Sequence, residues 1–134
     1  MTIMGRVTAK VWVSSSAPDS DFVVRLLDVH PDGMMHNLCD GILRARYRDG
    51  LSEAHWLQPG VVYQLPIDLW STAHTVKAGH RLGVMVTSSS FPRWDRNWNT
   101  TEDPAAATSG PIAQQCIWHD ATHPSHVVLP VMPG

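Results

Sequence analysis

A chain of 134 residues and 14.8 kDa is long enough for one domain and too short for two well-buried cores. Its 43% apolar and 16% charged residues exclude intrinsic disorder, and a formal net charge of −2 excludes the basic surface of general nucleic-acid or anionic-membrane binders. No apolar run approaches the roughly 20 residues that cross a bilayer. The N-terminus also lacks the pattern of a secretory signal, so we expect one soluble domain, with the cytoplasm favoured as its location.

The first half of the chain predicts a series of short strands. Arg6 to Ser14 alternates apolar and polar residues, as a half-buried strand does. Phe22 to Val29 is almost continuously apolar, which is typical of a strand covered on both faces or of a central strand. The sequence His30-Pro31-Asp32-Gly33 suits a type I turn, so Met34 to Cys39 is expected to return as a hairpin partner. Ile42 to Tyr47 forms a further short segment.

The second half continues the series. Val61 to Leu69 alternates again, and Pro66 within it cannot donate to a ladder, which predicts an edge or bulged strand. Leu69 to Val76 is the best helical candidate, a turn or two long. His80 to Ser88 is a strand in which Gly83 marks a bulge or a close backbone approach. The last two expected strands are Gln114 to His119 and His126 to Met132. Short strands at this spacing, with no long helical stripe, predict an all-β antiparallel sandwich.

No residue pattern predicts catalysis by this chain. The strand-to-helix elbow of serine hydrolases needs G-x-S-x-G, and the segment from Gly50 to Ala54 lacks the final glycine. Cys39 and Cys116 are far apart and belong to no C-x-x-C pair, which excludes a disulfide framework and a four-cysteine zinc site. Two buried free thiols are the favoured interpretation over a single disulfide.

One histidine cluster could in principle bind metal. His119, His123 and His126 lie close in sequence beside Asp120, and imidazoles with a carboxylate suit zinc or iron. Pro124 interrupts the cluster, however, and the spacing matches no ligand-bearing helix. A turn between two strands is the favoured interpretation, so we predict no metal and no cofactor.

The most informative segment runs from Ser88 to Thr101, which is rich in charges and amides yet carries three aromatic residues. Three interpretations remain open: a platform for glycans, a docking loop against a neighbouring domain, and a self-sufficient cap in which Asp95 pairs with Arg93 or Arg96. Interface cores favour aromatic residues and arginine, which supports the docking loop over the glycan platform. The candidate docking residues are Phe91, Arg93, Trp94, Asp95, Arg96, Asn97, Trp98 and Asn99.

Several sequence blocks resemble one family of enzymes. The blocks occur in the family's order over nearly the whole chain: Asp28 to Gly33, Asp40 to Arg44, Lys77 to Leu82, Ser88 to Thr100, and His119 to Ser125. Together they resemble the C-terminal domain of the X-Pro dipeptidyl-peptidase and cocaine esterase (CocE/NonD) group of serine hydrolases, which cleave amide or ester bonds. The resemblance implies a jelly-roll sandwich of the galactose-binding-like type. It also implies a partner, the α/β-hydrolase domain that carries the catalytic triad.

The resemblance shapes our functional hypotheses. Residues 1–134 are expected to form a single non-catalytic domain, without the hydrolase domain and without the family's first strand or strands. Trp94 would anchor the docking loop to the hydrolase, while Arg93, Asp95 and Arg96 would fix its orientation and the domain would help to shape the substrate cleft. A free-standing carbohydrate-binding module is the alternative, since jelly rolls also bind sugars.

Two further expectations concern stability and assembly. If Phe91 and Trp94 shield Asp95, removing that carboxylate is expected to lower stability by more than about 1 kcal/mol. A missing first strand would leave a ladder unpaired, either beside Arg6 to Ser14 or on the strand that would pair with the missing segment. The absent hydrolase domain would leave an apolar patch open to water. Both features predict a homodimer or a larger assembly through the exposed edge.

Overall fold

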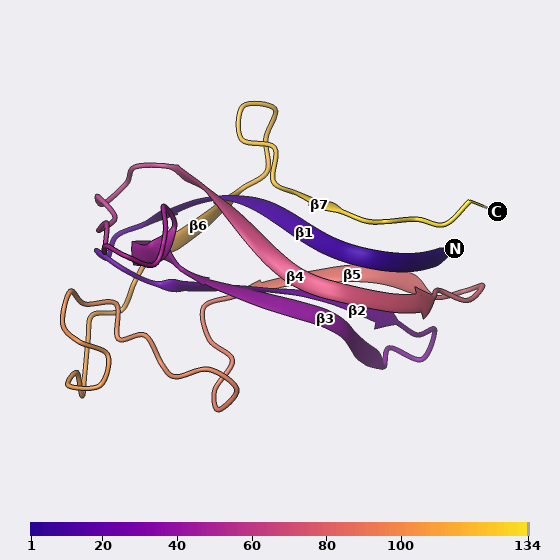
Figure 1. The fold of residues 1–134 in the computed structure, drawn as a ribbon, viewed down its shortest axis with the longest axis horizontal. Helices are drawn as coiled ribbons and strands as arrows, with labels where there is room; N and C mark the ends of the chain where they lie inside the picture. Colours follow the sequence, from indigo (N-terminus) through magenta and orange to yellow (C-terminus); the bar gives the residue numbers. More distant parts are fainter. Residues whose placement is uncertain (134) are drawn as a thin grey trace.

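The computed structural model describes residues 1–133, which form two antiparallel β-sheets packed face to face (Figure 1). The elements in chain order are β1 (Thr2–Ser15), β2 (Asp21–Val29), β3 (Met35–Arg44), a short 3-10 helix η1 (Ala45–Tyr47), β4 (Tyr63–Thr75), β5 (Arg81–Thr87), β6 (Gln115–Trp118) and β7 (His126–Val128). This architecture confirms the predicted all-β sandwich. Within these residues no helix has the length and hydropathy of a membrane span.

The long strand β1 is the centre of the first sheet. One of its edges pairs with β4 along nearly its whole length, and the other pairs with β6 and then with β7. The N-terminal end of that second edge is covered by the C-terminal segment, where Met4 N–H donates to the Pro130 carbonyl and Ile3 bridges Val131. The expected open ladder beside Arg6 to Ser14 is therefore wrong, because both edges of β1 are occupied.

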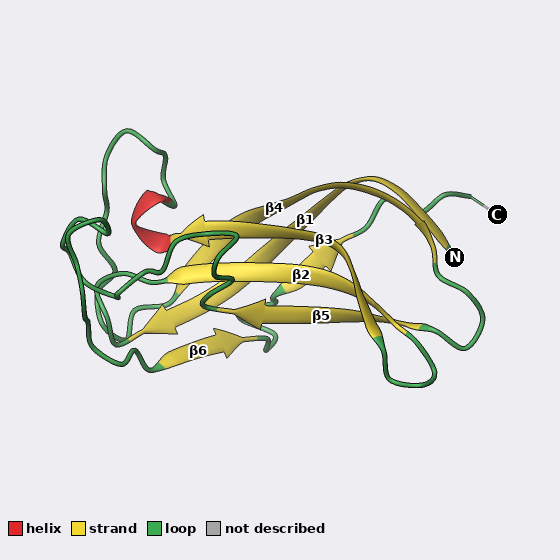
Figure 2. Cartoon of the chain, turned by 90° about the horizontal axis from the view of Figure 1, so that it is seen from below, coloured by secondary structure: helices red, strands yellow, loops and turns green. Residues whose placement is uncertain are grey.

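The second sheet has the order β3-β2-β5, with β2 in its centre (Figure 2). The consecutive residues Phe22, Val23 and Val24 are all buried, which confirms a strand covered on both faces. The core between the sheets takes alternate residues of β1 and β4, together with Phe22 and Leu26 from β2. Its largest fully buried apolar side chains are Phe22, Ile3, Leu26, Leu65, Ile67 and Leu69.

The two sheets meet closely along β3 and β4. A Cβ built on Gly41 of β3 would lie 1.9 Å from the Asp68 carbonyl oxygen of β4, so only glycine fits this approach. On the opposite side, between β5 and β6 with β7, the sandwich is open. An apolar groove of about 360 Å³ runs there, lined by Val11, Val24, Val84, Val86, Ile117, Ser125, His126, Val127 and Leu129.

Several local predictions needed correction. The helical candidate Leu69 to Val76 is wrong: these residues continue β4 as far as Thr75, because Thr2 to Arg6 of β1 extend far enough to pair with them. Met34 to Cys39 and Ile42 to Tyr47 are not separate segments, since β3 runs unbroken to Arg44 and ends in η1. A register shift between Leu26 and Leu27 accommodates the longer strand.

Three further predictions concern Pro66, Gly83 and the two cysteines; the first two are confirmed, and the third is wrong for one cysteine. Pro66 lies in an edge strand, because among residues 1–133 β4 pairs with β1 alone. This confirms the prediction from its missing N–H. Gly83 does face a close neighbour, since a Cβ there would lie 3.0 Å from a methyl carbon of Val29. Both cysteines are free, but only Cys39 is buried; Cys116 on β6 is exposed, so the prediction of two buried thiols is wrong.

Candidate docking surface

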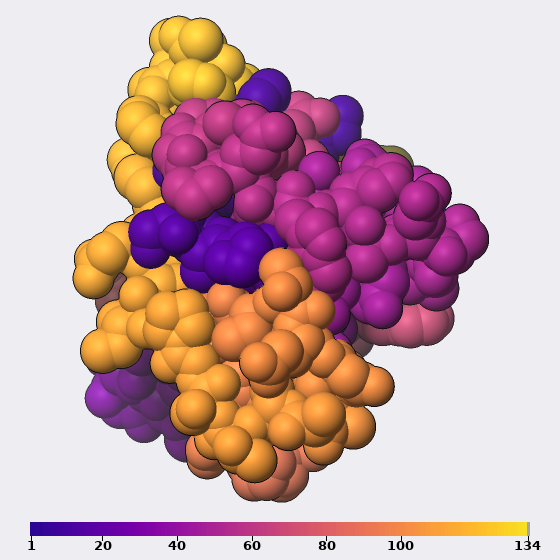
Figure 3. All heavy atoms as spheres, turned by 90° about the vertical axis from the view of Figure 1, so that its left-hand side faces the viewer, coloured from indigo at the N-terminus to yellow at the C-terminus, as the bar shows by residue number. Residues whose placement is uncertain are grey.

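The proposed docking loop belongs to the long connection between β5 and β6, residues 88–114. In Figure 1 this connection projects from the end of the sandwich opposite the two chain termini. Figure 3 looks onto that end: the connection (orange) and the segment after β3 (magenta) lie on either side of the β1–β2 turn (indigo). The loop is thus built beside the start of β2 and the end of β3.

Asn97 fixes the loop to the body of the domain. Its side-chain amide donates to Asp19 Oδ2 at 2.6 Å and to Asp21 Oδ1 at 2.8 Å. Both carboxylates are almost fully buried, at 0% and 2% exposed, so each needs charged or polar partners to offset its lost hydration. Asn97 shares this task with Arg44 and Arg46, which makes it a structural residue of the loop.

Two arginines complete this network, Arg44 at the end of β3 and Arg46 in η1. Arg46 is buried and ion-pairs with Asp19 at 2.7 Å, while its Nη2 donates to the loop carbonyl of Thr100 at 2.9 Å. Arg44 forms a two-pronged ion pair with Asp21, at 2.8 and 3.0 Å. The hydrogen bonds to Asp21 outweigh burial and hold the pKa of Arg44 above its usual value. Two ion pairs, Arg44 with Asp21 and Arg46 with Asp19, therefore lie beneath the loop and support it.

Trp98 and Asn99 are also part of the frame. Asn99 adopts φ 61°, a left-handed conformation that asparagine tolerates better than most residues, and its side-chain amide donates to the Pro111 carbonyl at 3.1 Å. Opposite it, a Cβ on Gly110 would lie 1.7 Å from the Trp98 carbonyl oxygen. The long connection therefore folds back on itself here, and Trp98 is half-buried within it.

The tip of the loop is different, because its side chains face solvent. Phe91 is 62% exposed, and the guanidinium of Arg96 stacks over its ring at 5.0 Å. Arg93 stacks over the half-buried Trp94 at 4.8 Å and ion-pairs with Asp40 of β3 at 3.0 Å. Aromatic and arginine side chains are thus held in place while remaining accessible.

The structure corrects our expectation for Asp95. Its carboxylate pairs with Arg44 of β3 at 3.3 Å, and its side chain is 68% exposed. Arg93 and Arg96 are directed to other partners, and neither Phe91 nor Trp94 shields the carboxylate from water. An ion pair as exposed as this contributes about 0–1 kcal/mol, so the expected loss of more than 1 kcal/mol on removing Asp95 no longer follows.

Sequence reasoning missed one exposed aromatic residue beside the loop. Trp70 of β4 is 69% exposed and has φ 65°, which is strained for a residue with a bulky side chain. It borders a hollow of about 260 Å³ that Arg93 and Asp40 also line. Its outward position next to the inward Leu69 was readable from the alternation, but its nearness to Arg93 depends on how the sheets pack.

The histidines of the 119–126 segment do not gather around a common point. Asp120 accepts the backbone N–H groups of Thr122 and His123, both at 2.8 Å, and these hydrogen bonds hold its pKa below the usual value. His126 instead lies 2.7 Å from the Pro124 carbonyl. The segment is a turn between β6 and β7, in agreement with the favoured interpretation.

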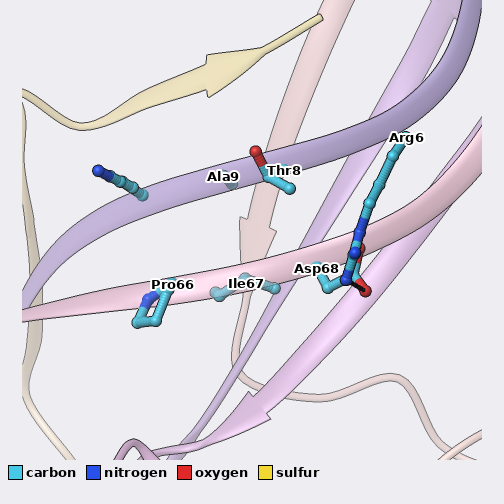
Figure 4. A pocket seen from close by; sticks show the side chains of 7 residues that line it. Arg6, Thr8, Ala9, Pro66, Ile67 and Asp68 are labelled. Carbon is cyan, nitrogen blue, oxygen red and sulfur yellow. Dashed lines mark hydrogen bonds and ion pairs between the residues drawn. The ribbon is translucent and has the colours of Figure 1, made fainter.

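A second hollow, of about 300 Å³, lies over β1 and β4 at a register shift between Arg6 and Thr8 (Figure 4). Arg6 reaches across to Asp68 and forms a two-pronged ion pair, at 3.1 and 2.7 Å. The hydrogen bonds from Arg6 hold the pKa of Asp68 below its usual value, and the pair leaves Lys10 as the remaining charged residue among those that line the hollow. We therefore assign no site here.

Comparison with known proteins identifies the family. The profile of the X-Pro dipeptidyl-peptidase C-terminal non-catalytic domain matches residues 1–128. The chain belongs to this family. It is 41% identical to a cocaine esterase from Rhodococcus sp., over 97% of this chain and 23% of that protein. The chain thus spans about a quarter of the length of this relative.

Solved structures agree with the family assignment. An α-amino acid ester hydrolase matches with a TM-score of 0.91 and 30% identity, over 98% of this chain and 24% of its own. An aminopeptidase from a marine sediment Thaumarchaeota archaeon matches with a TM-score of 0.89 and 32% identity, over the same two shares. The domain in hand therefore has the fold of the corresponding part of both proteins.

Proposed function

We propose that this chain is the accessory domain of a serine hydrolase that cleaves ester or amide bonds. The match of residues 1–128 to a non-catalytic domain family carries the proposal. The cocaine esterase and the α-amino acid ester hydrolase favour an ester substrate, whereas the aminopeptidase and the family name favour a peptide. In this role the domain packs on the α/β-hydrolase domain and helps to wall its substrate cleft.

We further propose that the loop tip makes the contact with the hydrolase domain. Phe91 and Trp70 supply exposed aromatic surface. Arg93 connects the two, because it belongs to the loop and also lines the hollow beside Trp70. Interface hot spots are enriched in these residue types. Trp94, Arg96 and Asp95 support the tip, and Asn97 holds it on the sandwich through Asp19 and Asp21. Asn99 adds hydrogen bonds to Ser20 and to the Pro111 carbonyl, and Trp98 lies half-buried beside it.

A domain exchange tests the accessory function. The segment of the Rhodococcus cocaine esterase that matches this chain is replaced by residues 1–134. We expect a soluble chimera that hydrolyses p-nitrophenyl acetate within about tenfold of the parent esterase, a difference of about 1.4 kcal/mol in barrier. The parent protein without this segment is expected to lose activity or to aggregate. A chimera no better than the deletion would contradict the accessory function.

The contact surface is tested in the same chimera. Phe91→Ser and Trp70→Ser together are expected to lower its inactivation temperature, while leaving the isolated domain as stable as before because both side chains are exposed. Leu51→Ser is the matched control, since Leu51 is 86% exposed and lies in a different loop. An effect of Leu51→Ser alone would move the contact to that loop. Sugar-dependent quenching of tryptophan fluorescence in the isolated domain would instead favour a carbohydrate-binding module.

A further inference from the structure

A cluster of histidines surrounds a single buried carboxylate at the end of the sandwich where both chain termini lie. Asp28, at the end of β2, is in phase with the inward-facing Phe22, Val24 and Leu26, and its side chain is 3% exposed. The β2–β3 turn and the β4–β5 turn meet at this end (Figures 1 and 2). Asp28 therefore lies where three segments of the chain converge.

Two histidines already contact the Asp28 carboxylate. His80, just before β5, has its Nδ1 2.9 Å from Oδ1. His74 of β4 pairs across the ladder with the fully buried Ile3, which places it on the inner face, and its Nε2 lies 2.8 Å from Oδ2. Burial raises the pKa of Asp28, but the hydrogen bonds from His74 and His80 together lower it below the usual value.

A third histidine lies beside them without a hydrogen bond of its own. His30 has its Nε2 3.9 Å from Asp28 Oδ2, too far for a hydrogen bond, and within residues 1–133 neither of its ring nitrogens finds another partner. Its ring packs against His80 at 4.3 Å between centroids, and against His36 at 4.7 Å. The His30 side chain is only 22% exposed, so its ring is packed within the cluster and is not free in solvent.

We propose that Asp28, His30 and His80 bind a divalent transition-metal ion of the zinc type. One ligand atom from each of these three residues lies within 4.8 Å of the other two. Two imidazole nitrogens and one carboxylate oxygen suit zinc, and three protein ligands leave the fourth tetrahedral position to water. This inference is independent of the proposed hydrolase role.

The observed distances are close to those that the ion requires. Bonds of about 2.0–2.1 Å in a tetrahedron place two ligand atoms about 3.3 Å apart. Asp28 Oδ1 lies 2.9 Å from His80 and Asp28 Oδ2 lies 3.9 Å from His30, on either side of this value, and the ligand atoms of the set lie within 4.8 Å of one another. Side-chain rotations that close the widest separation by up to about 1.5 Å make the site. His74 keeps its hydrogen bond to Asp28 and orients the carboxylate, as residues behind metal ligands commonly do.

The bound ion stabilises this end of the sandwich. It ties the end of β2 to the turn before β5, and through His74 it also fixes the end of β4. Since the site forms only in the folded chain, binding raises Tm by mass action. At an ion concentration of about 100 times Kd, we expect a rise in Tm of about 5–10 °C.

The test is a titration of the untagged 134-residue chain with Co²⁺, followed by displacement with Zn²⁺. We expect one Co²⁺ per chain, the visible absorption of a four-coordinate ion, and a Tm that rises with Zn²⁺ and falls back with chelator. His30→Ala and His80→Ala are expected to weaken binding more than His74→Ala, which should cost about tenfold. His30→Gln replaces His30→Ala if the latter fails to fold, as judged by tryptophan fluorescence.

His126→Ala is the matched control, because His126 is an exposed histidine at the start of β7 and is not a member of the Asp28 cluster. We expect it to bind Co²⁺ with unchanged affinity. Binding that fails to saturate at one ion per chain would overturn the proposal. So would wild-type affinity in the His30 and His80 variants, or a loss of binding caused by His126→Ala.

Discussion

At the scale of single residues, the loop from Phe91 to Asn99 contains two kinds of polar side chain that look equivalent in the sequence. Asn97 reaches two buried carboxylates, whereas Asp95 is 68% exposed and makes one long ion pair. The difference follows from what lies beneath each residue, namely Asp19 and Asp21 under Asn97, and solvent around Asp95. The pattern of charges along the chain could not distinguish Asn97 from Asp95, because the carboxylates of Asp19 and Asp21 come from a distant segment.

Asn97 is therefore expected to matter more for stability than Asp95. Asn97→Ala removes a donor from two buried carboxylates and should lower the free energy of unfolding by about 1–3 kcal/mol. Asn97→Asp should cost more, because it places a third carboxylate beside Asp19 and Asp21. Asp95→Ala is the matched control in the same loop and should cost less than about 1 kcal/mol. Urea denaturation followed by tryptophan fluorescence measures all three.

Equal losses for Asn97→Ala and Asp95→Ala would contradict this account. They would mean that the loop is held by its aromatic residues alone, and that the contacts of Asn97 with Asp19 and Asp21 add little. A smaller loss in Asn97→Asp than in Asn97→Ala would instead indicate that the new carboxylate accepts hydrogen bonds from Arg44 or Arg46.

At the scale of elements, local pattern predicted strands well and their ends poorly. Two patterns predicted the correct element, namely the alternation of Arg6 to Ser14 and the apolar run of Phe22 to Val29. Each pattern depends only on which faces of that strand are buried. Leu69 to Val76 was misread as helical because its strand depends on pairing with Thr2 to Arg6, far away in the chain. Likewise, no local signal could bring His74 and His80 to Asp28, since the pairing of β5 with β2 brings His80 there and the packing of the two sheets brings His74.

The close approach of β3 and β4 gives a prediction for a single glycine. Gly41→Ala would place a methyl group 1.9 Å from the Asp68 carbonyl oxygen, which is backbone and cannot rotate away. The strands must separate, and we expect a loss of about 1–3 kcal/mol in the free energy of unfolding. Ser71→Ala in β4, an exposed position, is the control and should change it by less than about 0.5 kcal/mol. Wild-type stability of Gly41→Ala in thermal denaturation would contradict this packing.

At the scale of the whole molecule, the sandwich is closed on one side and open on the other. Gly41 allows the closed side along β3 and β4, while the apolar groove lies between β5 and the β6 and β7 strands. Val84 in β5 lines this groove and is 53% exposed. Apolar surface on this side of the sandwich is therefore open to water.

The open side revises where self-association should occur. Of the two places that the sequence suggested for a free edge, the one beside Arg6 to Ser14 is wrong, because β1 is paired along both edges. Within the described residues β5 pairs with β2 alone, so its other edge can accept a strand from a second copy, and the groove can bury apolar surface at the same time. We therefore still predict a homodimer of the isolated chain, now through β5, with little opposition from a net charge of −2.

Two substitutions on β5 distinguish the two interactions that could stabilise such a dimer, burial of the apolar groove and backbone pairing along the edge of β5. Val84 lines the groove, whereas Met85 next to it faces the other side of the sheet. If burial of the groove drives association, Val84→Lys gives a monomer and Met85→Lys leaves the dimer intact; if backbone pairing along the edge dominates, both substitutions weaken the dimer alike. Light scattering coupled to size exclusion distinguishes these results. A wild-type chain that stays monomeric at high micromolar concentration would contradict the prediction, and the groove would then be too shallow to hold two copies together without the hydrolase domain.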